Sequence, residues 1–164
     1  MRALTENVIR SSFVNATEAE IGRIPIPGLH EVIWNSREYL GWRDSQSRQR
    51  GYIVHWQNDR PIGIVLHASE VGLRPGIPAM CGLCLTHQPS SQVTLFSAAR
   101  AGQSGRDGNT VGTYICDDLA CSILIRIAAP AHPMHPDPND VVTVKAEGLL
   151  ARLDAFTTGV MKTA

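Results

Sequence analysis

The stretch Cys81-Gly82-Leu83-Cys84 is followed, after 31 intervening residues, by a second cysteine pair, Cys116 and Cys121, whose members are separated by four residues. These are all the cysteines of the chain. Zinc readily binds four thiolates in a tetrahedron, and a closed set of four protein ligands leaves no position for water, as is typical of a structural site. The spacing therefore predicts one structural Zn²⁺ bound by these four cysteines.

The residues around the cysteines predict how the site is built. Gly82 permits the tight turn of a zinc knuckle. Asp117 and Asp118 open an apolar stretch that suits a short helix, and the positive end of that helix favours the thiolates of the second pair. Two strands and the glycine-rich loop between them are expected at 92–100, 110–116 and 101–109. A knuckle, a hairpin and a helix in this order predict a treble-clef zinc finger.

Three other interpretations of the cysteines remain open. Two disulfides would need an oxidising compartment, which nothing in the sequence indicates. The first pair also resembles a thioredoxin-type redox motif, but such a motif opens a helix, whereas Thr86, Gln88 and Pro89 follow here. Four unconnected buried thiols are the third alternative. The spacing favours structural zinc over all three.

Five histidines are further candidates for metal binding or for packing. His87 lies three residues after Cys84 and could replace a ligand. His132 and His135 could bind a metal ion, although a solvated pair in a linker is the favoured interpretation. His55 and His67 fall within expected strands and are interpreted as packing or hydrogen-bonding residues.

Upstream of the finger, the sequence predicts helices followed by a hairpin. Thr17 and Glu20 fit a capping box at the start of a short helix. A further helix is expected over 29–42, with Gly41 as its C-terminal cap. Strands rich in β-branched and aromatic residues follow over 51–57 and 62–69, and the turn cluster Asn58-Asp59-Arg60-Pro61 between them predicts a β-hairpin.

Downstream of the finger, a proline-rich linker leads to a final helix. Asn139 or Asp140 is expected to cap this amphipathic helix, whose apolar residues recur every three to four positions. The whole chain is therefore predicted to be α+β, with N-terminal helices, an antiparallel β-hairpin, a treble-clef zinc finger and a C-terminal amphipathic helix. The predicted segments are 1–41, 42–129 (hairpin and finger), 130–140 and 141–164.

Composition and charge exclude several classes of protein. The chain has 164 residues, 15 Lys and Arg against 15 Asp and Glu, and 43% hydrophobic residues, which suits one globular domain. Zero net charge argues against a protein that binds nucleic acid mainly by neutralising phosphates. Glu6 and Asn7 stand where a signal peptide would be apolar, and no apolar run is long enough for a bilayer. A cytoplasmic protein with no membrane or sequence-specific nucleic-acid partner is expected.

Enzyme motifs are missing from the sequence. There is no G-x-S-x-G elbow, no Walker lysine and no dinucleotide fingerprint. Asp117 and Asp118 are adjacent, so their carboxylates diverge, and a helix-capping role is preferred. We therefore expect a protein that is not an enzyme.

An interaction face is expected on or beside the zinc hairpin, because aromatic and arginine side chains are the usual anchors of protein interfaces. For Phe96, a place in the core is the favoured alternative. For the two arginines, solvent exposure without a partner is an equal alternative. The candidate partner-binding residues are Phe96, Arg100, Arg106, Asn109 and Tyr114.

Five segments together resemble a known family: LGWRD (40–44), GYIVHWQNDRPIGIVLH (51–67), AMCGLC (79–84), VTLFSAARAGQSGRDGNTVGTYIC (93–116) and DDLACSILIR (117–126). They resemble the elongation-factor-G-binding proteins that end in a treble-clef zinc finger, which are the fusidic-acid-resistance type and their short bacterial relatives. The resemblance covers roughly residues 1–127.

This resemblance implies a zinc site at the four cysteines and binding to elongation factor G, with the finger as a main contact. It also implies an action on the ribosome, since the resistance proteins promote release of the factor from drug-stalled ribosomes. Two alternatives remain. One is a ribosomal-RNA-binding zinc module that uses Arg100, Arg106 and the 43–50 loop, and the other is a thiol oxidoreductase that uses Cys81 and Cys84.

Overall fold

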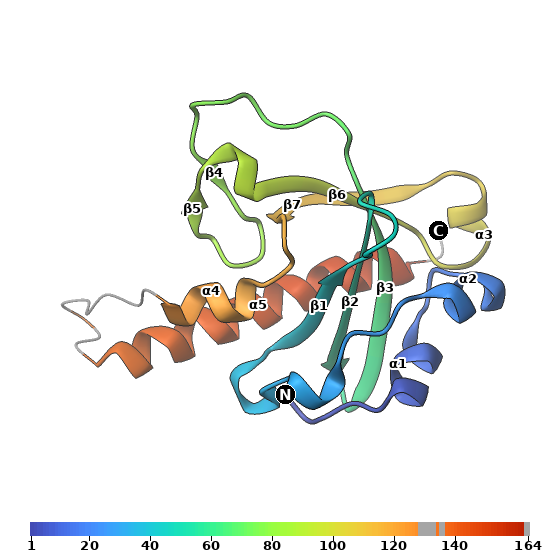
Figure 1. The fold of residues 1–164 in the computed structure, drawn as a ribbon, viewed down its shortest axis with the longest axis horizontal. Coiled ribbons are helices and arrows are strands. Elements are labelled where there is room, and N and C mark those ends of the chain that lie inside the picture. Colours follow the sequence, from blue (N-terminus) through green and yellow to red (C-terminus); the bar gives the residue numbers. More distant parts are fainter. Residues whose placement is uncertain (128–133, 135–136, 163–164) are drawn as a thin grey trace.

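Five antiparallel strands form the central sheet, in the order β1-β2-β3-β6-β7 (Figure 1). The structure is a computed structural model that describes residues 1–127, 134 and 137–162. The strands are β1 (Tyr39–Arg43), β2 (Arg50–Gln57), β3 (Arg60–Ala68), β6 (Val93–Ala99) and β7 (Thr110–Cys116). A second, two-stranded sheet pairs β4 (Ala79–Met80) with β5 (His87–Gln88). The strands of the finger thus belong to the same sheet as the upstream hairpin.

The predicted hairpin is confirmed as β2 and β3, which pair along their whole length. Its turn is made by Asn58 and Asp59, both with positive φ (47° and 61°), as the type I′ turns of tight hairpins require. β3 and β6, in contrast, pair only where the end of β3 meets the middle of β6, His67 with Ser97 and Ala68 with Phe96. The sheet is therefore two ladders that diverge from a short common segment.

Asn15 holds the diverging strands together. Its side-chain amide donates to the carbonyl oxygens of Val65 in β3 and Ala99 in β6, each at 3.0 Å. Its side-chain oxygen accepts from the backbone N–H of Val65 at 2.8 Å. One asparagine thus satisfies backbone groups that would otherwise be left without a partner where the ladder opens.

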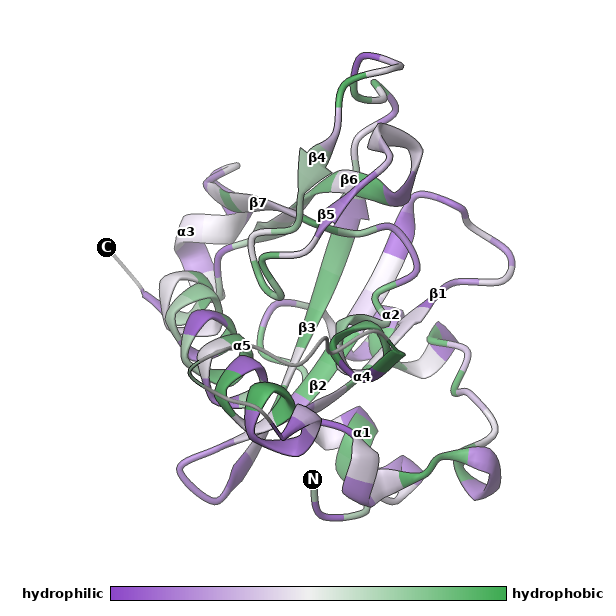
Figure 2. Cartoon of the chain, turned by 90° about the vertical axis from the view of Figure 1, so that its left-hand side faces the viewer, coloured by the Kyte–Doolittle hydropathy of each residue, from purple (hydrophilic) through white to green (hydrophobic). Residues whose placement is uncertain are grey.

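Both faces of the first ladder are buried, which explains why the residues of β2 and β3 are apolar in a row rather than alternating. On one face, the strands pack against α4 (Cys121–Ile127) and α5 (Pro138–Met161). On the other face they pack against the N-terminal helices (Figure 1). The residues facing α4 and α5 include Tyr39, Ile53, Ile64 and Leu66, and those facing the N-terminal segment include Leu40, Trp42, Tyr52 and Val65. In Figure 2, β2 and β3 run through the middle of the molecule with long green stretches.

The N-terminal segment is less helical than expected. Helices α1 (Glu6–Ser12) and α2 (Glu18–Arg23) form, and the capping box of Thr17 and Glu20 is confirmed. The predicted helix over 29–42 is wrong. Two short 3₁₀ helices, Leu29–Glu31 and Trp34–Ser36, precede β1 there, and Gly41 lies within β1. The physical reason is that Tyr39, Leu40 and Trp42 alternate between two cores, which only a strand allows.

The C-terminal helix packs onto its own chain. The N-cap of α5 is Asp137, whose side chain accepts from the N–H of Asn139 at 2.8 Å, so the expected cap at Asn139 or Asp140 is two or three residues late. Apolar residues of the predicted stripe enter the core shared with the sheet and α4: Leu149, Leu153, Phe156 and Val160. A second difference lies in the 101–109 loop, which contains the short helix α3 (Gly102–Arg106). None of the helices in the described part of the chain meets the length and hydropathy needed to cross a membrane.

Candidate metal centre

The four cysteine sulfurs form one compact, buried cluster, as the spacing predicted. All four lie within 4.8 Å of one another. Sγ to Sγ distances are 3.7 Å for Cys81 and Cys121, 3.6 Å for Cys84 and Cys116, and 3.5 Å for Cys116 and Cys121. A tetrahedron with Zn–S bonds of about 2.3 Å has edges of roughly 3.8 Å, whereas a disulfide is about 2.05 Å long. The cluster therefore matches a tetrathiolate metal site and not two disulfides.

The first pair lies on a zinc knuckle whose backbone points at the metal site. The N–H groups of Leu83 and Cys84 approach the sulfur of Cys81 at 3.4 and 3.5 Å. Gly82 donates to the carbonyl oxygen of Tyr114 at 2.7 Å, and a Cβ at this glycine would lie 2.6 Å from Thr113 Oγ1. Glycine is required because the knuckle is pressed against β7.

The second pair spans the turn between β7 and α4. Cys116 ends the strand and Cys121 begins the helix. Leu119 adopts a positive φ of 58° and donates to the Cys116 carbonyl oxygen at 2.9 Å. The carboxylate of Asp118 accepts from the N–H of Ala120, the residue before α4, at 2.9 Å, so it stabilises the turn and does not itself cap the helix as predicted. The turn thus returns the chain to the cluster within four residues.

Three residues that sequence reasoning missed support the cluster from outside. The side-chain amide of Gln88 donates to Cys116 Sγ at 3.2 Å. The buried hydroxyl of Tyr39 in β1 accepts from the N–H of Cys121 at 3.3 Å. Arg152 in α5 donates from Nε to the carbonyl oxygen of Leu83 at 2.6 Å. These contacts join β5, β1 and α5 to one site, and no local sequence pattern marks them.

The electrostatics of the cluster favour a cation. Hydrogen bonding with Cys116 lowers the pKa of Cys81 to about 7, while hydrogen bonding with Cys116 raises the pKa of Cys121 well above its ordinary value. Burial raises the pKa of Tyr39, and nearby thiolates raise it further. Four buried thiolates repel one another, and a divalent cation removes that repulsion. The residues present therefore fit Zn²⁺, with no ligand position left for chemistry.

The candidate histidines lie elsewhere. His87 is in β5 and is not part of the cluster. His132 and His135 lie outside the described residues. His55 is fully buried and hydrogen-bonds to Thr157 Oγ1 at 3.2 Å, as a packing and hydrogen-bonding role predicts, whereas His67 is exposed.

The five residues predicted to form a partner-binding face do not all lie on one surface, because Arg100 and Asn109 pair across the hairpin tip whereas Phe96 is in the core. Phe96 is completely buried, with the Arg43 guanidinium 5.0 Å from its ring centroid, and so takes the core position that the sequence left as its alternative. Arg100 and Arg106 line a pocket of about 260 Å³ between β6 and the N-terminal segment. Asn109 lies at the hairpin tip, where it donates to Ser104 Oγ at 3.2 Å. Tyr114 is 42% exposed and pairs with Leu95, four residue pairs from the tip of the ladder.

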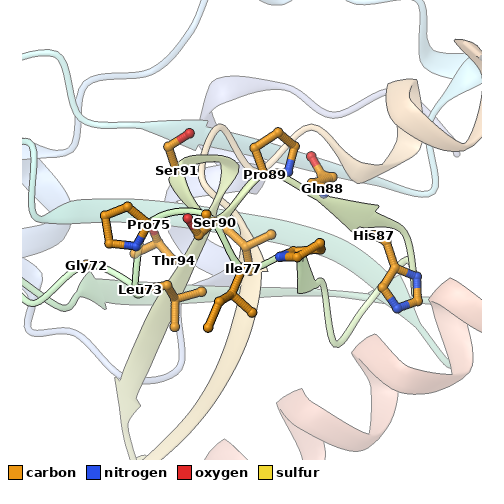
Figure 3. Close-up of a pocket in the computed structure, with 13 residues that line it drawn as sticks. Gly72, Leu73, Pro75, Ile77, His87, Gln88, Pro89, Ser90, Ser91 and Thr94 are labelled. Carbon is orange, nitrogen blue, oxygen red and sulfur yellow. The ribbon is translucent and has the colours of Figure 1, made fainter.

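A groove of about 860 Å³ adjoins the metal centre (Figure 3). The loop after β3 forms one wall and the segment from β5 to β6 forms the other. Figure 3 shows Leu73 and Ile77 beside Ser90 and Thr94, with His87 at one end. Gln88 lines this groove and also donates to Cys116, so it contacts both the groove and the metal cluster.

A knuckle, a β-hairpin and a helix, with the second cysteine pair at the junction of the hairpin and the helix, define a treble-clef zinc finger, here continuous with a larger antiparallel sheet. The chain matches the family of the FBP C-terminal treble-clef zinc-finger over residues 8–160 and belongs to that family. Among solved structures, the fold is similar to that of the fusidic acid resistance protein FusC, with a TM-score of 0.54 and 20% identity. The match covers 88% of this chain and 54% of FusC, so the chain spans about half the length of that protein. No curated protein matches the chain.

Proposed function

We propose that this protein is a non-enzymatic zinc-binding adaptor of the cytoplasm that binds elongation factor G and promotes its release from the ribosome. The observation that carries the proposal is the closed tetrathiolate centre in a chain of the FBP treble-clef family. Such a centre has no open ligand position, so it supports a structural role for the metal and a binding role for the surface around it. The fold shared with a fusidic acid resistance protein supports the choice of partner.

The alternative RNA-binding role is weaker because basic side chains of the 43–50 loop have internal partners. Arg43 donates to the carbonyl oxygen of Asp117 at 3.0 Å and forms an ion pair with its carboxylate at 3.3 Å. Arg50 lies 4.0 Å from the carboxylate of Glu20. Arginines already paired with carboxylates are less available to phosphates. A redox role is likewise weakened, because Cys81 and Cys84 are buried among two further thiols.

Calorimetric titration of the zinc-loaded chain with purified elongation factor G tests the proposal. Saturable binding at micromolar concentrations or tighter is expected, with modest salt dependence. Absence of binding would refute the proposed partner. Steeply salt-dependent binding to ribosomal RNA in its place would favour the alternative. Release is tested separately, by measuring how fast labelled factor leaves fusidic-acid-stalled ribosomes with and without this protein.

A further inference from the structure

In the part of the chain that the structure describes, the outer edge of β7 has no neighbouring strand, because β7 is the last strand of the sheet. The hydrogen bonds at the two ends of the β6–β7 pairing show which residues of β7 bond to β6. Arg100 donates to Asn109 O and Asp117 donates to Gln92 O, both at 2.9 Å. In an antiparallel pair, alternate residues bond to the neighbouring strand, so the odd-numbered residues of β7 bond to β6. Between Thr110 and Ile115, the backbone groups that point away from the sheet are therefore those of Thr110, Gly112 and Tyr114. Cys116, at the end of the strand, also points outward, and its carbonyl oxygen accepts from Leu119 in the following turn.

These outward backbone groups are accessible. Gly112 has no side chain and is exposed, so its backbone itself faces solvent. Thr110 and Tyr114 are exposed as well. One of the groups is already used, since the carbonyl oxygen of Tyr114 accepts from Gly82 at 2.7 Å. Within the described residues, no hydrogen bond is made to the outward groups of Thr110 and Gly112. The knuckle therefore occupies one end of the edge and leaves the rest open.

The two edges of the sheet differ in how they are protected. Natural proteins blunt a free edge with charges, proline, a bulge or a covering segment. At the opposite edge of the sheet, β1 carries a charged residue, Arg43, at its end. The β7 sequence, TVGTYIC, contains neither a charged residue nor a proline. An unblocked edge of this kind is typical of a surface that pairs with another chain.

We propose that the free edge of β7 binds an extended segment of elongation factor G by strand addition. This inference rests on the proposed function. In strand addition, backbone hydrogen bonds supply affinity and alternate side chains supply specificity. Gly112 leaves a gap on the outer face between Thr110 and Tyr114, and an aromatic or large aliphatic side chain opposite an edge glycine fills such a gap. The segment is therefore expected to place a large apolar residue opposite Gly112.

Hydrogen exchange distinguishes strand addition from other modes of binding. In the free chain, the amides of Thr110, Gly112 and Tyr114 should exchange fast, and those of Val111 and Thr113 slowly. In the complex with purified elongation factor G, the three fast amides should become protected, which removes the alternation. Exchange would be carried out on the intact complex, quenched, and resolved residue by residue by electron-transfer fragmentation in a mass spectrometer.

Paired variants test the same edge. Gly112→Pro removes the outward N–H donor, and an edge strand tolerates proline where its N–H faces solvent. It should weaken binding at least about tenfold. Gly112→Ala keeps the N–H and should bind within about twofold of the original chain. Its Cβ would lie 3.3 Å from the Phe96 carbonyl oxygen, a tight contact that a backbone shift of a few tenths of an ångström relieves. Circular dichroism and zinc content check that both variants fold.

The outcomes separate this inference from the proposed function. If the factor binds the original chain while the three amides still exchange fast and Gly112→Pro binds equally well, strand addition is wrong and the partner stands. If the factor does not bind the original chain at all, the proposed function fails. A dimer of the free chain with these amides already protected would show that a second copy occupies the edge, which also overturns the inference.

Discussion

The guanidinium of Arg152, in the middle of α5, donates from Nε to the carbonyl oxygen of Leu83 at 2.6 Å, between the first two cysteines of the metal centre. These residues are 69 positions apart in the sequence. The contact means that α5 supports the zinc knuckle directly, in addition to packing on the sheet. We therefore expect metal binding and docking of the C-terminal helix to be coupled, with Arg152 as the polar contact beside the apolar core that α5 shares with the knuckle.

Replacing Arg152 should loosen that coupling. We expect Arg152→Met to lower the free energy of unfolding by about 1–2 kcal/mol, because a hydrogen bond from a charged donor is lost while its aliphatic stem is kept. Loss of zinc to a chelator should also become faster. Denaturant unfolding and a chelator-competition assay measure both effects. Glu147→Ala, on the exposed side of the same helix, is the matched control and should change neither quantity.

Removing a ligand should abolish the metal site. Elemental analysis of the purified chain should give one zinc per chain, and Cys81→Ser or Cys116→Ser should lose the metal and melt at a lower temperature. The reason is that metal-binding free energy contributes to folding when the unfolded chain has no preformed site. Melting of either variant at the original temperature would contradict the structural role of the metal. Chelation of the unmodified chain should reproduce the behaviour of the variants.

Gln88 should increase the affinity of the site for zinc without being a ligand. Its amide donates to Cys116 Sγ at 3.2 Å, and loss of an outer hydrogen bond of this kind typically lowers metal affinity about 10- to 100-fold. We expect Gln88→Ala to retain zinc with a dissociation constant about tenfold higher. Competition with a chromophoric chelator measures the constant. The exposed Gln92→Ala serves as the control, and equal affinity of the two variants would exclude this role for Gln88.

His55 should make the protein less stable in mild acid. Burial lowers its pKa from 6.5 to about 4, so the unfolded chain binds the proton more readily and the free energy of unfolding falls as the pH drops below 6.5. The loss between about pH 7.5 and about pH 5 should be about 2 kcal/mol. His55 Nδ1 lies 3.3 Å from a carboxylate oxygen of Asp154, but neither atom has a hydrogen bond. Burial raises the pKa of Asp154, and a raised carboxyl pKa acts in the opposite direction at lower pH.

The measurement for His55 is the difference in pH dependence between two proteins, because zinc thiolates also become protonated in acid. Urea unfolding of the original chain and of His55→Gln would be compared at both pH values. The variant should lose about 2 kcal/mol less than the original chain. His30→Gln is the control, since the His30 side chain is 83% exposed. If His55→Gln and the original chain have the same pH dependence, the buried imidazole is not responsible.

Sequence reasoning succeeded where structure depends on neighbours within a few residues. The capping box at Thr17, the turn at Asn58 and Asp59, the strands that flank the glycine-rich loop, and the apolar stripe of α5 are all local patterns. It failed at 29–42, where short apolar runs suit either a helix or a strand. The choice there was made by the two cores on opposite faces of β1.

For the metal centre, the sequence by itself determined the ligand set, because tetrathiolate chemistry needs only the right residue types at a suitable spacing. Only the tertiary structure decided what surrounds those ligands. Gln88, Tyr39 and Arg152 reach the cluster from three elements, and Phe96 lies in the core rather than on a face. The open edge of β7 is likewise set by strand order. Contacts between residues far apart in the chain follow from packing the whole sheet, which no local pattern encodes.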